Sequence, residues 1–134
     1  MTSGPSLLKR ATTKLAEINQ SAADARAAVE LAKMGVPYLP WPASAIAPSA
    51  LLSILNDIEI NGRRNIVEFG CGISTVYMAM VAKRTGARII SFDDNPAWAA
   101  IVRGWIDRIE AAAHCEIVIA PLGPNDHAAE GNHW

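Results

Sequence analysis

The sequence predicts an α/β fold built on a parallel β-sheet. Between residues 61 and 120, short runs rich in Ile, Val and Phe alternate with longer segments of helical period. Strands separated by helices in this way form right-handed crossovers and therefore run parallel. The runs do not alternate apolar with polar residues, so we expect a sheet that is covered on both faces.

The predicted strands and helices of this region alternate and are joined by short loops. The strands are expected at residues 65–69, 88–92 and 115–120, and the helices at 74–83 and 96–113. Turn-forming residues at 61–65, sequence NGRRN, precede the first strand. The tail at 123–134 contains turn formers and no hydrophobic period, so we expect it to be loose.

Residues 7–33 are predicted to form one long helix or two shorter ones, which end before Gly35. Apolar residues recur there at three- and four-residue steps, namely Leu7, Leu8, Ala11, Leu15, Ile18, Ala22, Ala25, Val29 and Ala32. A helix with one apolar stripe usually packs that stripe against the core. We therefore interpret it as a covering helix.

A proline-rich connector follows the first helix. Prolines impose an extended path there, and the aromatic residues Tyr38 and Trp41 are expected to fill the core. The alternative is a flap over a ligand site. Pro48 then lies near the start of a helix that continues to about Asn56.

Composition excludes several classes of function. The formal net charge is −1 and the pI is near 6.3, so nothing favours binding to nucleic acid or to an anionic membrane. Cys71 and Cys115 form no CxxC pair, and no signal peptide is evident, so we expect a reducing, cytoplasmic setting. The uncharged stretch 36–56 is long enough to span a bilayer, but its four prolines indicate a loop.

The stretch NIVEFGCGIST, residues 65–75, joins the first strand to the next helix. Gly70 and Gly72 permit a sharp turn and a close ligand approach. Backbone N–H groups and the positive end of the helix then surround one pocket, and Ser74 or Thr75 can cap that helix. This arrangement is typical of nucleotide-binding loops; the alternative is a plain tight turn.

The sequence around the loop argues against a dinucleotide-binding site. The dinucleotide fingerprint G-x-G-x-x-G, counted from Gly70, requires a glycine where Thr75 stands. Glu68 would also repel a pyrophosphate, whereas it would favour a cationic ligand. A dinucleotide-dependent oxidoreductase is therefore the weaker hypothesis.

A second acid follows the next strand. Asp93 lies 23 residues after Gly70, where both nucleotide classes place a carboxylate that accepts hydrogen bonds from the ribose hydroxyls. Asp93 is the first candidate for that role and Asp94 the second. Trp98 is either an adenine contact or, more simply, a core aromatic. These positions support an adenosine ligand without choosing its class.

The combination resembles class I S-adenosylmethionine-dependent methyltransferases. Their first motif, a hydrophobic strand, an acid and G-x-G-x-G, reads here Ile66-Val67-Glu68-Phe69-Gly70-Cys71-Gly72-Ile73-Ser74. The resemblance implies that Glu68 attracts the amino group of S-adenosylmethionine while the loop meets its carboxylate. Candidate cofactor-binding residues are Glu68, Gly70, Cys71, Gly72, Ser74, Asp93 and Asp94, with Ala120 to Leu122 as apolar contacts to adenine.

The resemblance also implies a Rossmann-like, three-layer fold with a partial parallel sheet of strand order 3-2-1. We therefore expect a helical N-terminal extension with a Pro-rich connector at residues 1–60 and a partial cofactor-binding domain at residues 61–134. The strand at 65–69 is central in that family, so its open edge is expected to recruit a second copy or a partner chain.

No catalytic residue can be named from the sequence. The histidines and cysteines lack metal-ligand spacing, so we expect no metal site. Cys71 at a helix N-terminus suits a small loop filler better than a nucleophile. Two hypotheses remain: an S-adenosylmethionine-dependent methyltransferase or the N-terminal part of one, and a non-catalytic nucleotide-binding or assembly module that retains half of the fold.

Overall fold

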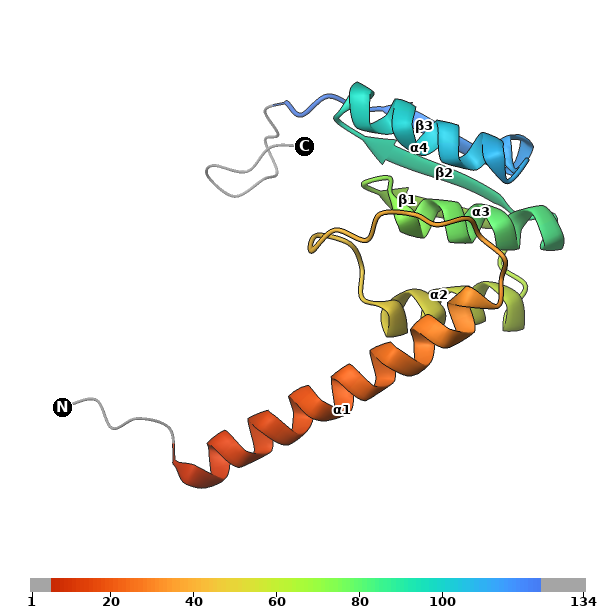
Figure 1. Ribbon diagram of the computed structural model, residues 1–134. Coiled ribbons are helices and arrows are strands. Elements are labelled where there is room, and N and C mark those ends of the chain that lie inside the picture. Colours follow the sequence, from red (N-terminus) through yellow and green to blue (C-terminus); the bar gives the residue numbers. More distant parts are fainter. Residues whose placement is uncertain (1–5, 124–134) are drawn as a thin grey trace.

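A computed structural model describes residues 6–123 (Figure 1). Its sheet has three parallel strands, β1 (Asn65–Phe69), β2 (Arg88–Asp93) and β3 (Cys115–Ile119), with β2 in the centre. The predicted α/β class, parallel strands and order 3-2-1 are therefore confirmed. The predicted tail from residue 124 onward lies outside the described residues.

The helices are α1 (Leu7–Ala32), α2 (Pro48–Ile60), α3 (Ile73–Thr85), α4 (Pro96–Arg108) and the short 3₁₀ helix η1 (Ala112–His114). The helix predicted at 96–113 is wrong at its end, because Glu110 adopts a left-handed φ of 54° and breaks the run before η1. The helix predicted to end near Asn56 continues to Ile60, with Ile58 buried in the core.

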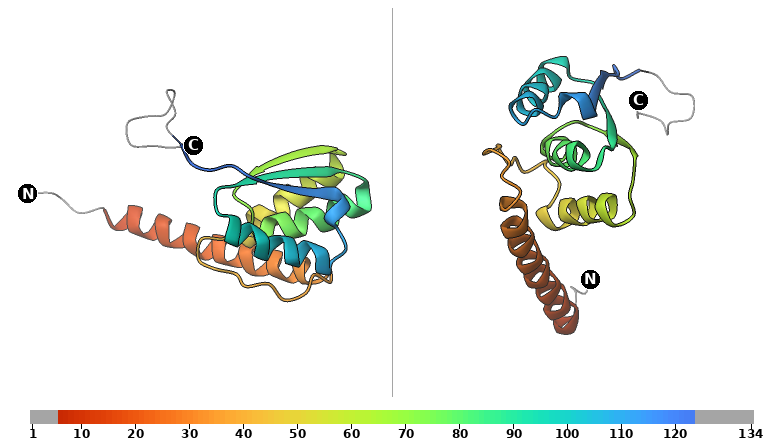
Figure 2. Two further views of the ribbon diagram at one scale, coloured as in Figure 1. Left: turned by 90° about the horizontal axis from the view of Figure 1, so that it is seen from above. Right: turned by 90° about the vertical axis from the view of Figure 1, so that its right-hand side faces the viewer.

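The helices that pack on the sheet, α3 and α4, lie on the same face of it (Figure 2). The strands follow one another in a single direction across the sheet, and right-handed crossovers then place both connecting helices on one side. The core forms between this face and the helices, around Leu51, Val76, Ile89 and Val102, which are all fully buried.

The expectation of helices on both faces is therefore not met within residues 6–123. On the opposite face Val67 is 59% exposed and Phe69 66% exposed, and the Phe69 ring stacks on that of Phe92 at 5.8 Å. Both faces of the sheet carry apolar residues, but the described part of the chain covers only one of them.

The first helix does not cover the body as predicted. Figure 1 shows α1 projecting from the rest of the protein, with only Ala27 and Leu31 buried along its length. Its C-terminal half packs on α2, where Asp24 accepts hydrogen bonds from the Ser49 amide (3.1 Å) and hydroxyl (2.6 Å). These bonds hold the pKa of Asp24 below its ordinary value. They also cap the N-terminus of α2, because the N-cap residue of that helix, Ala47, has no side-chain acceptor.

The connector between α1 and α2 differs from its main prediction. Tyr38 is 90% exposed and does not fill the core, whereas the neighbouring Leu39 is buried. Trp41 rests against the ring of Tyr77 with the centroids 6.3 Å apart. None of the described helices is long and apolar enough to cross a membrane.

Within residues 6–123 no strand pairs with the second side of β1. The amide of Gly70 donates to the carbonyl of Phe92, and that of Arg88 donates to the carbonyl of Arg64. Because amides alternate in direction along a strand, those of Ile66 and Glu68 point toward β2 and that of Val67 points toward the open edge.

We predict that hydrogen exchange will follow this alternation. The Val67 amide should exchange fast, while the amides of Ile66 and Glu68 should be protected, when exchange is measured residue by residue with NMR. The Gly86 amide, which donates to Ala82 at the end of α3, serves as an internal reference. Strong protection of Val67 would mean that another segment or chain occupies the edge.

Candidate functional site

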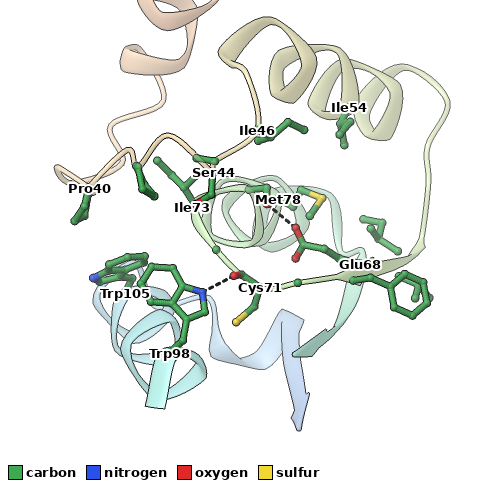
Figure 3. Close-up of a pocket in the computed structure, with 18 residues that line it drawn as sticks. Pro40, Ser44, Ile46, Ile54, Glu68, Cys71, Ile73, Met78, Trp98 and Trp105 are labelled. Atoms are coloured by element: carbon green, nitrogen blue, oxygen red, sulfur yellow. Dashed lines mark hydrogen bonds between the residues drawn. The ribbon is translucent and has the colours of Figure 1, made fainter. Parts of the chain in front are cut away.

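A cavity of about 630 Å³ opens at the carboxyl end of β1 (Figure 3). Its walls come from the connector, α2, the glycine loop, the first turn of α3 and the two tryptophans of α4. The lining residues include Pro40, Ser44, Ile46, Ile54, Glu68, Gly70, Cys71, Gly72, Ile73, Ser74, Met78, Trp98 and Trp105. The connector thus lies where the alternative interpretation, a flap over a ligand site, would place it.

The glycine loop is held by hydrogen bonds from three directions. Gly70 has a left-handed φ of 84°, which favours glycine, and its amide donates to the carbonyl of Phe92 at 2.7 Å. The Cys71 amide donates to Oδ2 of Asp93 at 2.8 Å, and its carbonyl accepts from Nε1 of Trp98 at 2.7 Å. The loop is therefore preorganised by β2 and α4 together.

Glu68 lies on the helix-covered face of β1 and accepts three hydroxyl hydrogen bonds. The donors are Ser74 (2.6 Å), Thr75 (2.5 Å) and Ser91 (2.9 Å). Ser91 stands directly opposite Glu68 in the parallel register. Sequence reasoning missed this partner, although a lone hydroxyl residue in the apolar run IISF could have indicated it.

The electrostatic surroundings of Glu68 favour its neutral form. Burial raises the pKa of its carboxyl and the charge of Asp93 raises it further, while the three hydroxyl hydrogen bonds act in the opposite direction. The carboxyl lines the cavity, so an added positive charge there would favour ionisation. The structure thus places an acid of raised pKa beside the glycine loop.

We predict that Glu68→Gln flattens the pH dependence of stability. A folded-state pKa above the unfolded value means that the native state binds more protons, so stability falls as pH rises from about 4.5 through the folded pKa. Urea unfolding of both proteins between pH 4 and 8 should show the wild type losing stability relative to the variant over this window. A constant difference between the two curves would show that Glu68 titrates alike in both states.

The two candidate acids at the end of β2, Asp93 and Asp94, differ in burial. Asp93 is buried, and besides Cys71 its carboxylate accepts from the Asn95 amide at 2.9 Å. Asp94 is exposed. Both line a second cavity of about 390 Å³, together with Phe69, Gly70, Phe92, Ala120 and Leu122. The acids and two of the predicted apolar contacts therefore meet at one place.

Other candidate residues are placed as follows. Trp98 lies on the first cavity and contacts Trp105 edge to face, with centroids 5.5 Å apart.

Burial raises the pKa of the Cys71 thiol to about 12 and that of Cys115 to about 11, so neither is an activated nucleophile. Among residues 6–123 no group of three or more His, Cys, Asp or Glu side chains could hold a metal ion.

The similarity of this chain to known proteins lies in its three-dimensional structure. No protein-family profile and no curated protein matches it. Solved structures do: an O-methyltransferase from Bacillus cereus in complex with SAH is 23% identical with a TM-score of 0.51, over 73% of this chain and 43% of its own. An SAH-bound methyltransferase from Podospora anserina is 12% identical with a TM-score of 0.58, over 90% of this chain and 53% of its own.

A third similar structure is cofactor-bound Rv0187 from MTB, at 22% identity and a TM-score of 0.50, over 75% of this chain and 44% of its own. The chain thus spans about half the length of the structures that it matches. Identities this low establish the fold and no more. The described residues have the class I methyltransferase fold over that part of its length.

Proposed function

We propose that this chain binds S-adenosylmethionine at the glycine loop, as part of a methyltransferase. One observation carries the proposal: the loop, the first turn of α3 and the two acid positions surround a pair of adjoining cavities that share Phe69 and Gly70. The similar structures with SAH or a cofactor bound support the same ligand class.

The loop fits a ligand that approaches the backbone closely. Gly72 lines the first cavity, and a Cβ added to it would meet no atom of residues 6–123 within 4 Å. Its φ of −179° is extended backbone that any residue adopts. The fold therefore does not itself require glycine at this position, whereas a ligand seated against the loop would.

Charge favours a cationic ligand over a pyrophosphate. The acids that line the two cavities are Glu68, Asp93 and Asp94, and among residues 6–123 neither lining contains Lys or Arg. S-adenosylmethionine has an ammonium and a sulfonium group, and its single carboxylate suits the first N–H groups of α3, at Ile73 and Ser74, which lack intrahelical partners. NAD would bring two phosphates to the same acids.

The second cavity suits the adenosine part. Each carboxylate oxygen of Asp93 accepts one amide hydrogen bond and retains capacity for another, so it can also accept from a ribose hydroxyl. Ala120 and Leu122 provide apolar surface beside it. Trp98 lies on the first cavity instead, and we assign it to holding Cys71 and the loop.

Transfer of the methyl group requires an acceptor aligned with it. When bound, the cofactor supplies an electrophilic methyl group on its sulfonium. Besides Glu68, Asp93 and Asp94, which we assign to the cofactor, the described cavity walls contain no His, Lys or Tyr that could act as a general base. That observation favours, as the second candidate, a cofactor-binding module without activity of its own. Both candidates belong to a cytoplasmic setting, since Cys71 and Cys115 are free thiols.

Calorimetric titration tests the ligand class. The full chain should bind SAH and S-adenosylmethionine more tightly than NAD, because the acids on the cavity walls repel a pyrophosphate. In titrations at low and high salt, the affinity for NAD should increase with salt, because salt screens the repulsion between the acids and the phosphates. Tighter binding of NAD at low salt would reject the proposal.

The variant Gly72→Ala tests the position of the ligand. Its melting temperature should be unchanged or slightly raised, since the added methyl group meets no protein atom. Its affinity for SAH should fall by about tenfold or more, a steric loss of about 1.4 kcal/mol. Gly104→Ala in α4, where a Cβ also meets nothing within 4 Å, is the matched control and should bind like the wild type. Equal SAH affinity in all three proteins would place the ligand elsewhere.

A further inference from the structure

The exposed side of α1 carries a regular heptad pattern. Its apolar residues alternate at steps of three and four over the whole helix: Leu8, Ala11, Leu15, Ile18, Ala22, Ala25, Val29 and Ala32. Such spacing sustained over four heptads is typical of a coiled-coil seam. We call these eight residues the α1 seam.

Every residue of the α1 seam is solvent-exposed. The large ones are 75% (Leu8), 59% (Leu15), 55% (Ile18) and 61% (Val29) exposed. The helix packs on α2 through a different face, where Ala27 and Leu31 are buried and Asp24 meets Ser49. At 100° per residue the centre of that face lies about 160° around the helix from the centre of the seam. A second helix could therefore pack on the seam without displacing α2.

The order of residues in the seam indicates its partner. Large residues predominate in the N-terminal half and alanine predominates in the C-terminal half. In an antiparallel pair of α1 helices whose two-fold axis lies level with Gln20, four kinds of layer form, each twice: Leu8 with Ala32, Ala11 with Val29, Leu15 with Ala25, and Ile18 with Ala22. Each layer combines one large side chain with one alanine.

Parallel pairing would give a much less even core. Each residue would then face its own copy, so Leu15 would meet Leu15 while Ala22 and Ala25 would meet alanine. Two helices cannot be close enough for alanine layers and far enough apart for leucine layers without leaving voids. Antiparallel pairing keeps one interaxial distance over about 36 Å of helix.

The residues beside the α1 seam are compatible with the antiparallel arrangement. The flanking pairs would be Thr12 with Arg26, Asn19 with itself, Lys14 with Ala28, and Ser21 with itself. No two like charges face each other, so repulsion does not oppose the pairing. The order of large and small residues thus favours the antiparallel pair, and charge does not oppose it.

We propose that α1 is a dimerisation helix, which pairs with α1 of a second copy of this chain as an antiparallel coiled coil along the α1 seam. The two bodies then lie on the outer sides of the helix pair, at opposite ends of it. Because β1 takes no part, the cofactor loop and the open sheet edge stay accessible in the dimer.

Sedimentation of the full chain at concentrations from about 1 to 100 μM, the range of ordinary protein complexes, tests the pairing. The wild type should be a dimer. Ala22→Glu places a carboxylate in the seam against Ile18 of the partner and should raise the dimer dissociation constant by about 100-fold. Ala23→Glu, the same change at the neighbouring exposed position outside the seam, should alter it by less than about threefold.

Two results of this experiment would overturn the proposal. One is a wild-type monomer throughout the range, including a monomer that instead co-sediments with lipid vesicles. The other is a dimer equally insensitive to both variants, which would place the interface elsewhere, as at the edge of β1. Circular dichroism of each variant shows whether it has kept its helices, and both positions are exposed in the single chain.

A distance measurement tests the direction of pairing. The native thiols of Cys71 and Cys115 have pKa values raised to about 12 and 11, so a new surface cysteine, Lys9→Cys, is the reactive site for a spin label. In the antiparallel pair the two labelled residues lie about 33 Å apart along the axis. A separation near the interaxial distance of about 10 Å would show parallel helices and overturn the proposal.

Discussion

The carboxylate of Asp93 is the interaction on which the site depends. It accepts from the Cys71 amide with one oxygen and from the Asn95 amide with the other, so it joins the loop after β1 to the loop after β2. Asn95 in turn caps α4 through the Trp98 amide at 3.1 Å, and the Trp98 indole returns to the Cys71 carbonyl. These bonds form a closed circuit, and the low dielectric strengthens those of Asp93 and of the Trp98 indole, which are buried or partly buried.

Glu68 shows a conflict between stability and ligand binding. Burial opposes ionisation of this carboxyl more than its three hydroxyl donors favour it, so the ionised form is disfavoured in the absence of a ligand. A cationic ligand would reverse that balance, because it would stabilise the ionised form. Residues that reduce stability in the absence of a ligand are common where binding needs them.

The handedness of the crossovers accounts for the apolar surface that remains exposed. Strands laid down in one direction send α3 and α4 to a single face, which leaves Val67 and Phe69 exposed on the other. A second exposed apolar surface, the α1 seam, has a different origin: α2 packs on the opposite side of the helix, where Ala27 and Leu31 are buried. The fold thus offers two separate surfaces for association.

The sequence by itself determined the strands, the glycine loop and the position of the two acids, because local patterns encode them: apolar runs, Gly70 and Gly72, and an acid near the end of β1 and of β2. Tertiary structure alone decided what those patterns pack against. The stripe on α1 predicted a buried face, yet α2 packs on the other side, where Asp24 bonds to Ser49 and Leu31 is buried. Likewise only the parallel register placed Ser91 beside Glu68. Periodicity fixes which residues share a face, but the partner of that face depends on contacts between residues far apart in the chain.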